Sequence, residues 1–343
     1  MNNNALKFLF LFAVIGAVLF SRFAYPHSGI LPSLSANQAD LLTISGVPTP
    51  EPQPGTTLND LNSSGAVSAA PTPEPAAQPA TGTPSGYVAG ESTPAFAKVG
   101  NAAPPKMTDA ASLVADLENG TPLYALNPNA RWPMASLTKL MTAAVALDVY
   151  RTSQTVAVTP QELAVDPEEF TLQAGGTYTV DDLLRVLLLP SSNVAAEALA
   201  QSYGRPQFLA LMNRKAAEWN MTNTFYDDPS GLSAANQSTA SDLLTLAQHV
   251  YADYPQILAI TRVPHVTVTN LATGQKAAVN SIDNFSGRTD FVGGKTGHTD
   301  EASGNLLTIF DYGNHPLFVL VLGTADRFGD SLKLYNWVKS NYR

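Results

Sequence analysis

Cysteine is absent from the 343 residues of the chain. Its absence excludes disulfide bonds, iron–sulfur centres, thiolate zinc sites, a cysteine nucleophile and a lipid-modified N-terminal cysteine. Histidine is scarce, with five residues, and no two of them form an H-x-x-x-H pair. The sequence therefore predicts no histidine-based metal site.

Positively charged residues are also few. Lys and Arg together number 19 against 28 Asp and Glu, which gives a formal net charge of −9. The chain contains no run rich in Lys or Arg, and this excludes nucleic acid as a partner class. The length and a hydrophobic content of 45% suffice for one large domain or two ordinary ones.

The N-terminus carries one long apolar run, FLFLFAVIGAVLF at residues 8–20, between Lys7 and Arg22. We expect residues 1–25 to form a signal-anchor that spans the cytoplasmic membrane. A cleaved signal peptide, which would leave a secreted protein, is the alternative. The anchor is favoured because the best cleavage sites place Arg22 or Leu34 at the −3 position, where a small residue is preferred.

A linker rich in Pro, Ala, Ser, Thr and Gly follows, over about residues 26–105. It contains the pentapeptide PTPEP twice, at 48–52 and 71–75. Such a composition buries too little apolar surface to offset the entropy of ordering, so we expect a disordered, partly extended spacer. It would hold a globular domain, residues 106–343, away from the membrane.

The globular part has strand patterns at both ends and helix patterns between them. Glu118-Asn119-Gly120 joins the first two strands, and Asn-Gly is a strong hairpin signal. The sequence predicts an α+β fold in which one sheet is assembled from the two ends, with a helical lobe inserted. We expect strands over 110–117, 122–126, 265–270, 275–280, 305–310 and 317–324, and helices over 136–150, 180–190, 193–204, 206–220 and 239–254.

The stretch FVGGKTGHTDEA at 291–302 resembles the end of a phosphate-binding loop at first sight. That motif requires a glycine at position 289, which is Thr289, and a helix directly after the lysine. Apolar strand patterns follow instead, separated by the turn cluster DYGNHP. We therefore expect Lys295 to lie on a strand and to face an anion other than a phosphate.

Three short segments carry candidate chemistry. The first is Ser136-Leu137-Thr138-Lys139, where the serine and lysine lie one turn apart at the start of a helix. A serine hydroxyl needs a base within hydrogen-bond reach, and a lysine serves as that base only if its pKa is lowered. The second is Ser191-Ser192-Asn193, in a turn between two helices. The third is Lys295-Thr296-Gly297, whose lysine can keep Lys139 neutral. Each motif alone is weak, but their order and context together are specific.

The order of the motifs resembles that of the penicillin-recognising serine enzymes. Within them, the chain most resembles the low-molecular-mass D-alanyl-D-alanine carboxypeptidases, peptidase family S11, from about Ala110 to the C-terminus. This resemblance implies a serine β-lactamase/DD-peptidase-like fold and no metal or organic cofactor. The matching segments are LYALNPNARWPMASLTKLMTA (123–143), LLLPSSNVAAEALA (187–200), DDPSGLSAANQSTASDL (227–243) and GGKTGHTDEASGNLL (293–307).

The resemblance also implies catalytic roles. Ser136 attacks the carbonyl of the penultimate D-alanine of a peptidoglycan stem peptide, and Lys139 takes the serine proton. The terminal D-alanine leaves, and water then hydrolyses the acyl-enzyme. Ser191 relays a proton to the leaving amine, while Asn193 holds the substrate amide and orients Lys139.

Substrate-binding roles follow in the same way. Lys295 faces the C-terminal carboxylate, assisted by the Thr296 hydroxyl of the Lys295-Thr296-Gly297 motif. The backbone N–H groups of Ser136 and His298 form the oxyanion hole. Arg327, in TADRFGD, matches a family arginine near the carboxylate, although a solvated loop charge is an equal reading. β-Lactams should acylate Ser136 because they mimic the D-Ala-D-Ala terminus.

Two departures from the family pattern are visible. Family members usually have glycine where this chain has Ser192. Many also carry a C-terminal β-rich domain with an amphipathic anchor, whereas this chain stops at Arg343. We expect the N-terminal anchor to replace the C-terminal one, with the catalytic domain outside the cytoplasmic membrane.

Four other functions are alternatives to a carboxypeptidase. A Ser-His-Asp hydrolase built on His298 and Asp300 lacks a G-x-S-x-G elbow. A class A β-lactamase needs a glutamate in an E-x-x-L-N loop, and residues 227–229 read Asp-Asp-Pro instead. A D,D-endopeptidase that cuts cross-links uses the same apparatus and stays open. A catalytically silent wall-binding module is disfavoured because all motif residues are present.

Overall fold

A computed structural model describes residues 96–166 and 171–343. The expected membrane anchor and most of the expected linker lie outside the described residues, so those predictions stay untested. Within the described ranges, no helix is long and apolar enough to cross a bilayer.

A five-stranded antiparallel sheet forms the centre of the described chain, with strand order β2-β1-β11-β10-β9. It joins the two ends of the domain, as predicted, because β1 pairs with β11. The β9 strand lies at one edge, and this position leaves one side of its backbone unpaired within the sheet. The strands are β1 Ala111–Asp116, β2 Pro122–Leu126, β9 Phe291–Thr299, β10 Ser303–Tyr312 and β11 His315–Thr324.

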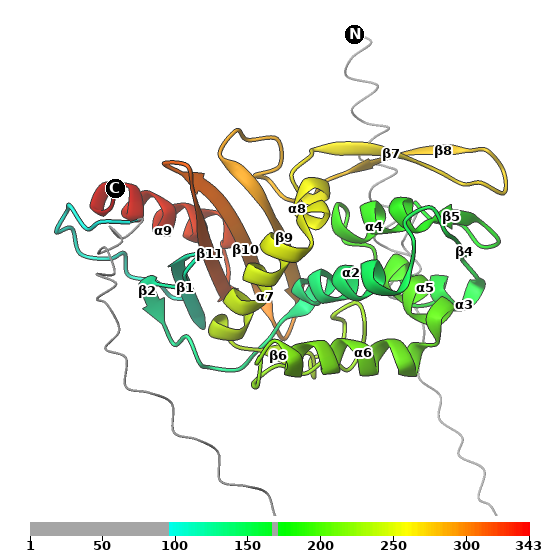
Figure 1. The fold of residues 1–343 in the computed structure, drawn as a ribbon, viewed down its shortest axis with the longest axis horizontal. Helices are drawn as coiled ribbons and strands as arrows, with labels where there is room; N and C mark the ends of the chain where they lie inside the picture. The colour runs from blue at the N-terminus through cyan, green and yellow to red at the C-terminus, as the bar shows by residue number, and fades with distance from the viewer. Residues whose placement is uncertain (1–95, 167–170) are drawn as a thin grey trace, which may run out of the picture. The chain divides into compact units, whose positions relative to one another are not determined.

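Both faces of this sheet are covered, which explains the continuous apolar runs in its central strands. Alternate side chains of β11 enter two different hydrophobic clusters: Phe318 and Leu320 face one, Val319 and Val321 the other. Helix α9 (Arg327–Asn341) packs on the second cluster, whereas α7 (Ala240–Asp253) and α8 (Pro255–Thr261) pack on the first (Figure 1).

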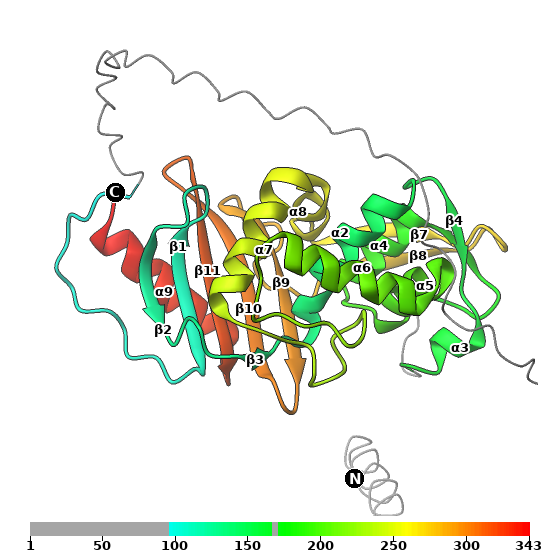
Figure 2. The same ribbon diagram turned by 60° about the horizontal axis from the view of Figure 1, so that its bottom comes forward.

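The predicted helical lobe lies beside the sheet, and the five long helices were predicted to within a few residues (Figure 2). The sequence analysis gave no range for α9, although this helix has 15 residues. It also missed α8, α3 and several short strands, which have too few residues for a periodic pattern. The remaining elements are α2 Thr138–Val149, α3 Pro160–Leu163, α4 Val180–Leu188, α5 Asn193–Tyr203, α6 Arg205–Glu218, β3 Trp132–Pro133, β4 Thr155–Ala157, β5 Thr177–Thr179, β6 Gln237–Ser238, β7 His265–Thr269 and β8 Lys276–Asn280.

Helix α2 is buried on all its faces over most of its length. Every residue from Thr138 to Ala146 is buried. The helix lies at the centre of the lobe, with α4, α5, α6 and α7 packed around it. This position carries Lys139 into the protein interior.

The start of the described chain also differs from the expectation. We assigned residues 96–105 to a disordered linker, yet residues 96–102 pack against the C-terminal helix. Ala97 N donates to Arg343 O at 2.8 Å, and the Trp337 indole donates to Ala102 O at 3.0 Å. The Phe96 ring is buried in the second cluster, where it stacks on Tyr312. A buried aromatic ring in a Pro- and Ala-rich stretch explains why composition alone placed this boundary too late.

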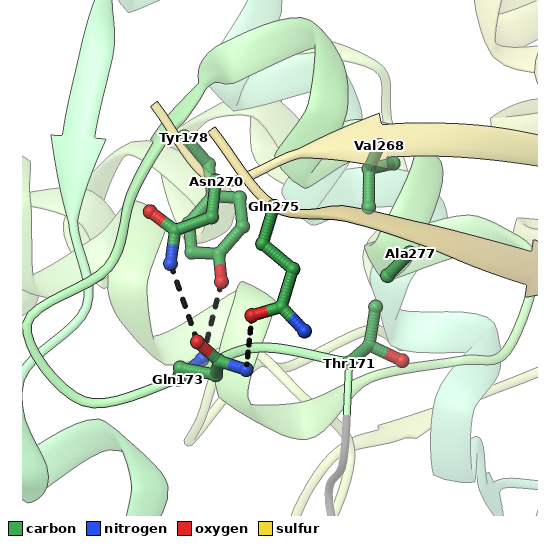
Figure 3. Close-up of a pocket in the computed structure, with 7 residues that line it drawn as sticks. All are labelled: Thr171, Gln173, Tyr178, Val268, Asn270, Gln275 and Ala277. Carbon is green, nitrogen blue, oxygen red and sulfur yellow. Dashed lines mark hydrogen bonds between the residues drawn. The ribbon is translucent and has the colours of Figure 1, made fainter. Parts of the chain in front are cut away.

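The β7–β8 hairpin holds the segment that precedes β5 (Figure 3). The Gln173 backbone N–H donates to the Tyr178 hydroxyl at 3.2 Å, and its side chain bonds to Asn270 and Gln275. These residues line a small polar pocket that includes no residue of the three motifs. We assign this pocket no role in catalysis.

Candidate active site

The turn that presents Ser136 is held from the sheet. Residues Ala135–Leu137 form a 3₁₀ turn ahead of α2, and Ala135 has a left-handed φ of 48°. The Asn305 side chain on β10 donates to Pro133 O at 2.9 Å and to Met134 O at 3.0 Å. Its carbonyl oxygen accepts from Gly323 N on β11 at 2.9 Å. One buried amide therefore fixes the turn of Ser136 to two strands.

Two glycines allow close approach to the same turn. A Cβ on Gly231 would lie 2.0 Å from Ala135 O, and Gly231 has a φ of +89°. A Cβ on Gly297 would lie 2.9 Å from Met134 O and 3.3 Å from Ser136 N. The third motif's glycine therefore brings β9 alongside the backbone N–H of Ser136.

Lys139 is completely buried and donates hydrogen bonds to three segments of the chain. Its Nζ lies 2.8 Å from Ser136 Oγ, 2.8 Å from Asn193 Oδ1 and 2.7 Å from Ser230 O. The structure thus brings together the first and second motifs, as the sequence analysis predicted. The Ser230 carbonyl is a partner that it did not predict.

Burial lowers the pKa of Lys139 from its usual value to about 7. Desolvation disfavours the charged ammonium form, while the carboxylates of Asp228 and Asp166 partly offset that effect. A lysine with a pKa near 7 is partly neutral at physiological pH. It can therefore accept a proton from a serine hydroxyl.

A tight loop places the Ser230 carbonyl. The buried Asp228 carboxylate accepts hydrogen bonds from the backbone N–H groups of Ser230, Gly231 and Ser233. Asn236 accepts from Asp228 N at 3.1 Å and donates to Thr138 Oγ1 at 3.0 Å. The turn-forming sequence Asp-Pro-Ser-Gly signals this loop, but its role beside Lys139 depends on long-range packing that the local pattern does not show.

The second motif lies in the turn between α4 and α5. Ser191 has a left-handed φ of 69°, whereas Ser192 has φ −55° and ψ 125°. The Ser192 hydroxyl accepts from Ala195 N at 3.0 Å and so caps the N-terminus of α5. Serine is accommodated where the family usually has glycine, because this position requires no left-handed backbone.

A hydrogen bond from Lys295 connects the third motif to the second. The Nζ of Lys295 donates to Ser191 Oγ at 2.8 Å and to Thr296 O at 3.0 Å. Burial lowers the pKa of Lys295, and the neighbouring charge of Lys139 lowers it further, while Asp283 opposes both effects. The two buried lysines therefore resist being charged at the same time.

The remaining predicted residues lie at the end of β9 and at the first residue of α9. The Arg327 guanidinium donates to Gly297 O at 3.1 Å, and His298 Nδ1 lies 3.0 Å from Ser303 O. His298, Ser303 and Arg327 line one hollow together with Gly304, Thr324 and Ala325. The Thr296 side chain is buried. The described residues include no group of three or more acidic or histidine side chains able to hold a metal ion.

Lys139 is hydrogen-bonded to Ser136, Lys295 is hydrogen-bonded to Ser191, and the edge strand β9 lies beside Ser136. This arrangement is the one expected of a serine hydrolase that uses a lysine as its base. The D-alanyl-D-alanine carboxypeptidase family model, Peptidase_S11, matches residues 98–326. The chain therefore belongs to this family of serine peptidases.

Relatives named for two different activities resemble the chain. A D-alanyl-D-alanine endopeptidase of Pseudomonas aeruginosa is 32% identical over 246 residues, which are 68% of this chain and 78% of that protein. The D-alanyl-D-alanine carboxypeptidase DacA of Haemophilus influenzae is 30% identical, over 70% of this chain and 64% of its own length. The DD-transpeptidase of Streptomyces K15 has a similar structure, with a TM-score of 0.64 and 25% identity over 70% of this chain and all of that one.

Proposed function

We propose that the protein removes the terminal D-alanine from peptidoglycan stem pentapeptides through an acyl-enzyme on Ser136. Family membership supports the reaction class. The hydrogen bonds of Lys139 support the assignment of the nucleophile.

The contacts of Lys139 carry this proposal. A charged lysine donates three hydrogen bonds, and Ser136 Oγ, Asn193 Oδ1 and Ser230 O are its three acceptors. When Lys139 is neutral, its nitrogen donates two bonds and accepts one. The two carbonyl oxygens have no proton to give, so the Ser136 hydroxyl must be the donor. Neutral Lys139 thus pulls the proton from Ser136 and increases its nucleophilicity.

Lys295 and Ser191 form a second proton path toward the leaving group. The Ser191 hydroxyl accepts from Lys295, so its own proton is available to the departing amine. A substrate carboxylate beside Lys295 would raise the pKa of this lysine and keep it charged. The charged Lys295 would then keep Lys139 neutral, and the free carboxyl terminus of the substrate would help to activate the nucleophile.

Substrate binding along β9 completes the proposal. Thr261 already accepts from Gly294 N, so an extended peptide would pair with the edge of β9 beyond Gly294, as in other cases of strand addition. Because Gly297 lies against Ser136 N, the N–H groups of Ser136 and His298 can serve as the two donors of an oxyanion hole. Arg327 and Thr296 would assist Lys295 at the carboxylate.

Cleavage of peptide cross-links is a second candidate activity. It is favoured by the relatives in Pseudomonas aeruginosa and Escherichia coli, which are named D-alanyl-D-alanine endopeptidases. The same catalytic groups serve both substrates, and the space beyond Arg327 would decide how large a leaving group is accepted.

We also propose where the reaction takes place. The apolar run at 8–20 supports an uncleaved anchor in the cytoplasmic membrane, and the following linker supports a catalytic domain on the outer side. β-Lactam antibiotics are expected as covalent inhibitors, because they acylate the same serine.

The proposal is tested by release of the C-terminal residue, which is D-alanine from a pentapeptide ending in D-Ala-D-Ala and D-alaninamide from the C-terminally amidated form of the same peptide. The wild type should act faster on the peptide with the free carboxylate, and Ser136→Ala should release nothing from either peptide. Lys295→Ala should lose more activity on the free-acid peptide than on the amidated one. Ser340→Ala, an exposed serine on α9, is the matched control and should act like the wild type. Turnover by Ser136→Ala would overturn the proposal, and an equal loss by Lys295→Ala on both peptides would refute the carboxylate role.

A further inference from the structure

Asp166 contacts a catalytic side chain but belongs to none of the three motifs. Its Oδ2 accepts a hydrogen bond from Asn193 Nδ2 at 2.9 Å. The residue lies just after the short helix α3, and 27 residues separate it from Asn193. Its side chain is half-buried beside the site.

This contact fixes which way the Asn193 amide points. A charged lysine only donates and a carboxylate only accepts, so Lys139 and Asp166 together admit one amide orientation. The oxygen must face Lys139 and the nitrogen must face Asp166. Without the carboxylate, the amide can rotate and offer its NH₂ group to Lys139, which would compete with the Ser136 hydroxyl for the lysine lone pair.

The backbone around Asp166 is held independently of the site. Thr159 and Glu162 form a capping box at the start of α3, and α3 packs against α5. Asp166 N donates to Leu163 O at 3.3 Å, which continues the turn after α3. The carboxylate therefore occupies its position before any substrate binds.

We propose that Asp166 is a positioning residue for acylation, whose carboxylate holds the Asn193 amide in the orientation that leaves Lys139 free to accept the Ser136 proton. This inference rests on the proposed function of Ser136 and Lys139. It adds a fourth segment to the three motifs, because an aspartate after α3 acts through the asparagine of the second motif.

A second consequence concerns the pH dependence of acylation. Asp228 from the loop before β6 and Asp166 both raise the pKa of Lys139, whereas Lys295 on β9 adds positive charge nearby. Removing the Asp166 charge should lower the pKa of Lys139, so its base form persists to lower pH. A residue that merely tied α3 to α5 would not produce this shift.

The test measures the acylation rate of the full-length protein by a fluorescent penicillin between pH 5 and 9. Asp166→Asn keeps an acceptor oxygen for Asn193 but removes the charge. In this variant the midpoint of the acid limb of the pH–rate profile should move down by about 0.5 pH unit or more. The plateau rate at high pH should stay within about twofold of the wild-type rate. Asp166→Ala should show the same shift and a plateau lower by about tenfold or more, because the amide loses its partner.

Asp253→Asn, an exposed carboxylate at the end of α7, changes the net charge equally and is the control, with no expected shift. An unshifted midpoint in Asp166→Asn, or an unreduced plateau in folded Asp166→Ala, would overturn the inference. If Asp166→Ala fails to fold, the midpoint of Asp166→Asn decides alone. A wild type that is never acylated would instead refute the proposed function itself.

Discussion

At the scale of the residue, the site depends on one lysine whose ordinary chemistry is changed by burial. Lys139 is fully buried, and desolvation lowers its pKa to about 7. The sequence predicted the need for a lowered pKa from the spacing of Ser136 and Lys139. It offered the charge of Lys295 as a cause, whereas the largest cause is burial. That burial arises when four helices surround α2, which local sequence patterns do not show.

The pH dependence of acylation follows from this lysine. In the proposed mechanism the free-base form of Lys139 is the reactive one, and the ammonium form predominates below its pKa of about 7. The acylation rate of the wild type should therefore rise with pH through about 7 and fall about tenfold per pH unit on the acid side. Stopped-flow measurement with a fluorescent penicillin checks this profile. A rate that is constant from pH 5 to 9 would contradict Lys139 as the base.

At the scale of the element, the site is assembled where short, irregular segments pass close to one another. The turn of Ser136, the loop of Gly231 and the strand of Gly297 approach within contact distance. The sequence indicated the strand of Lys295 and the helix that begins beside Ser136. The second motif accommodates Ser192, because this serine caps α5. The sequence could not indicate Asn305 or Asp166, whose partners lie far away along the chain, nor that the local loop held by Asp228 would reach Lys139.

Gly231 gives the sharpest test at this scale. In Gly231→Ala the new methyl group would collide with Ala135 O, 2.0 Å away, and φ is +89°. We expect a loss of roughly 3 kcal/mol or more in the free energy of unfolding, together with loss of acylation. Urea unfolding and penicillin labelling measure the two effects.

Gly274→Ala provides the matched comparison. Its φ is +74°, yet nothing lies within 4 Å of the new Cβ. Only backbone strain applies, so a cost of about 1 kcal/mol and normal labelling are expected. If the two variants behave alike, close packing of Gly231 on the Ser136 turn is not what makes that glycine necessary.

At the scale of the whole molecule, the sheet joins distant parts of the chain into one frame for the site. The prediction of a sheet built from both ends is confirmed by the pairing of β1 with β11. The position of β9 at the edge, beside Ser136, follows from the strand order, which local patterns do not specify. The packing of residues 96–102 on α9 was also missed, because local patterns do not specify contacts between distant parts of the chain.

Intact-mass spectrometry of the full-length protein at intervals after adding penicillin tests the central claim most directly. We expect one lasting adduct with the mass of the drug, located on Ser136 and absent from Ser136→Ala. A fleeting adduct with release of hydrolysed drug would indicate a β-lactamase instead. No adduct on the folded protein would contradict the proposal that Lys139 activates Ser136.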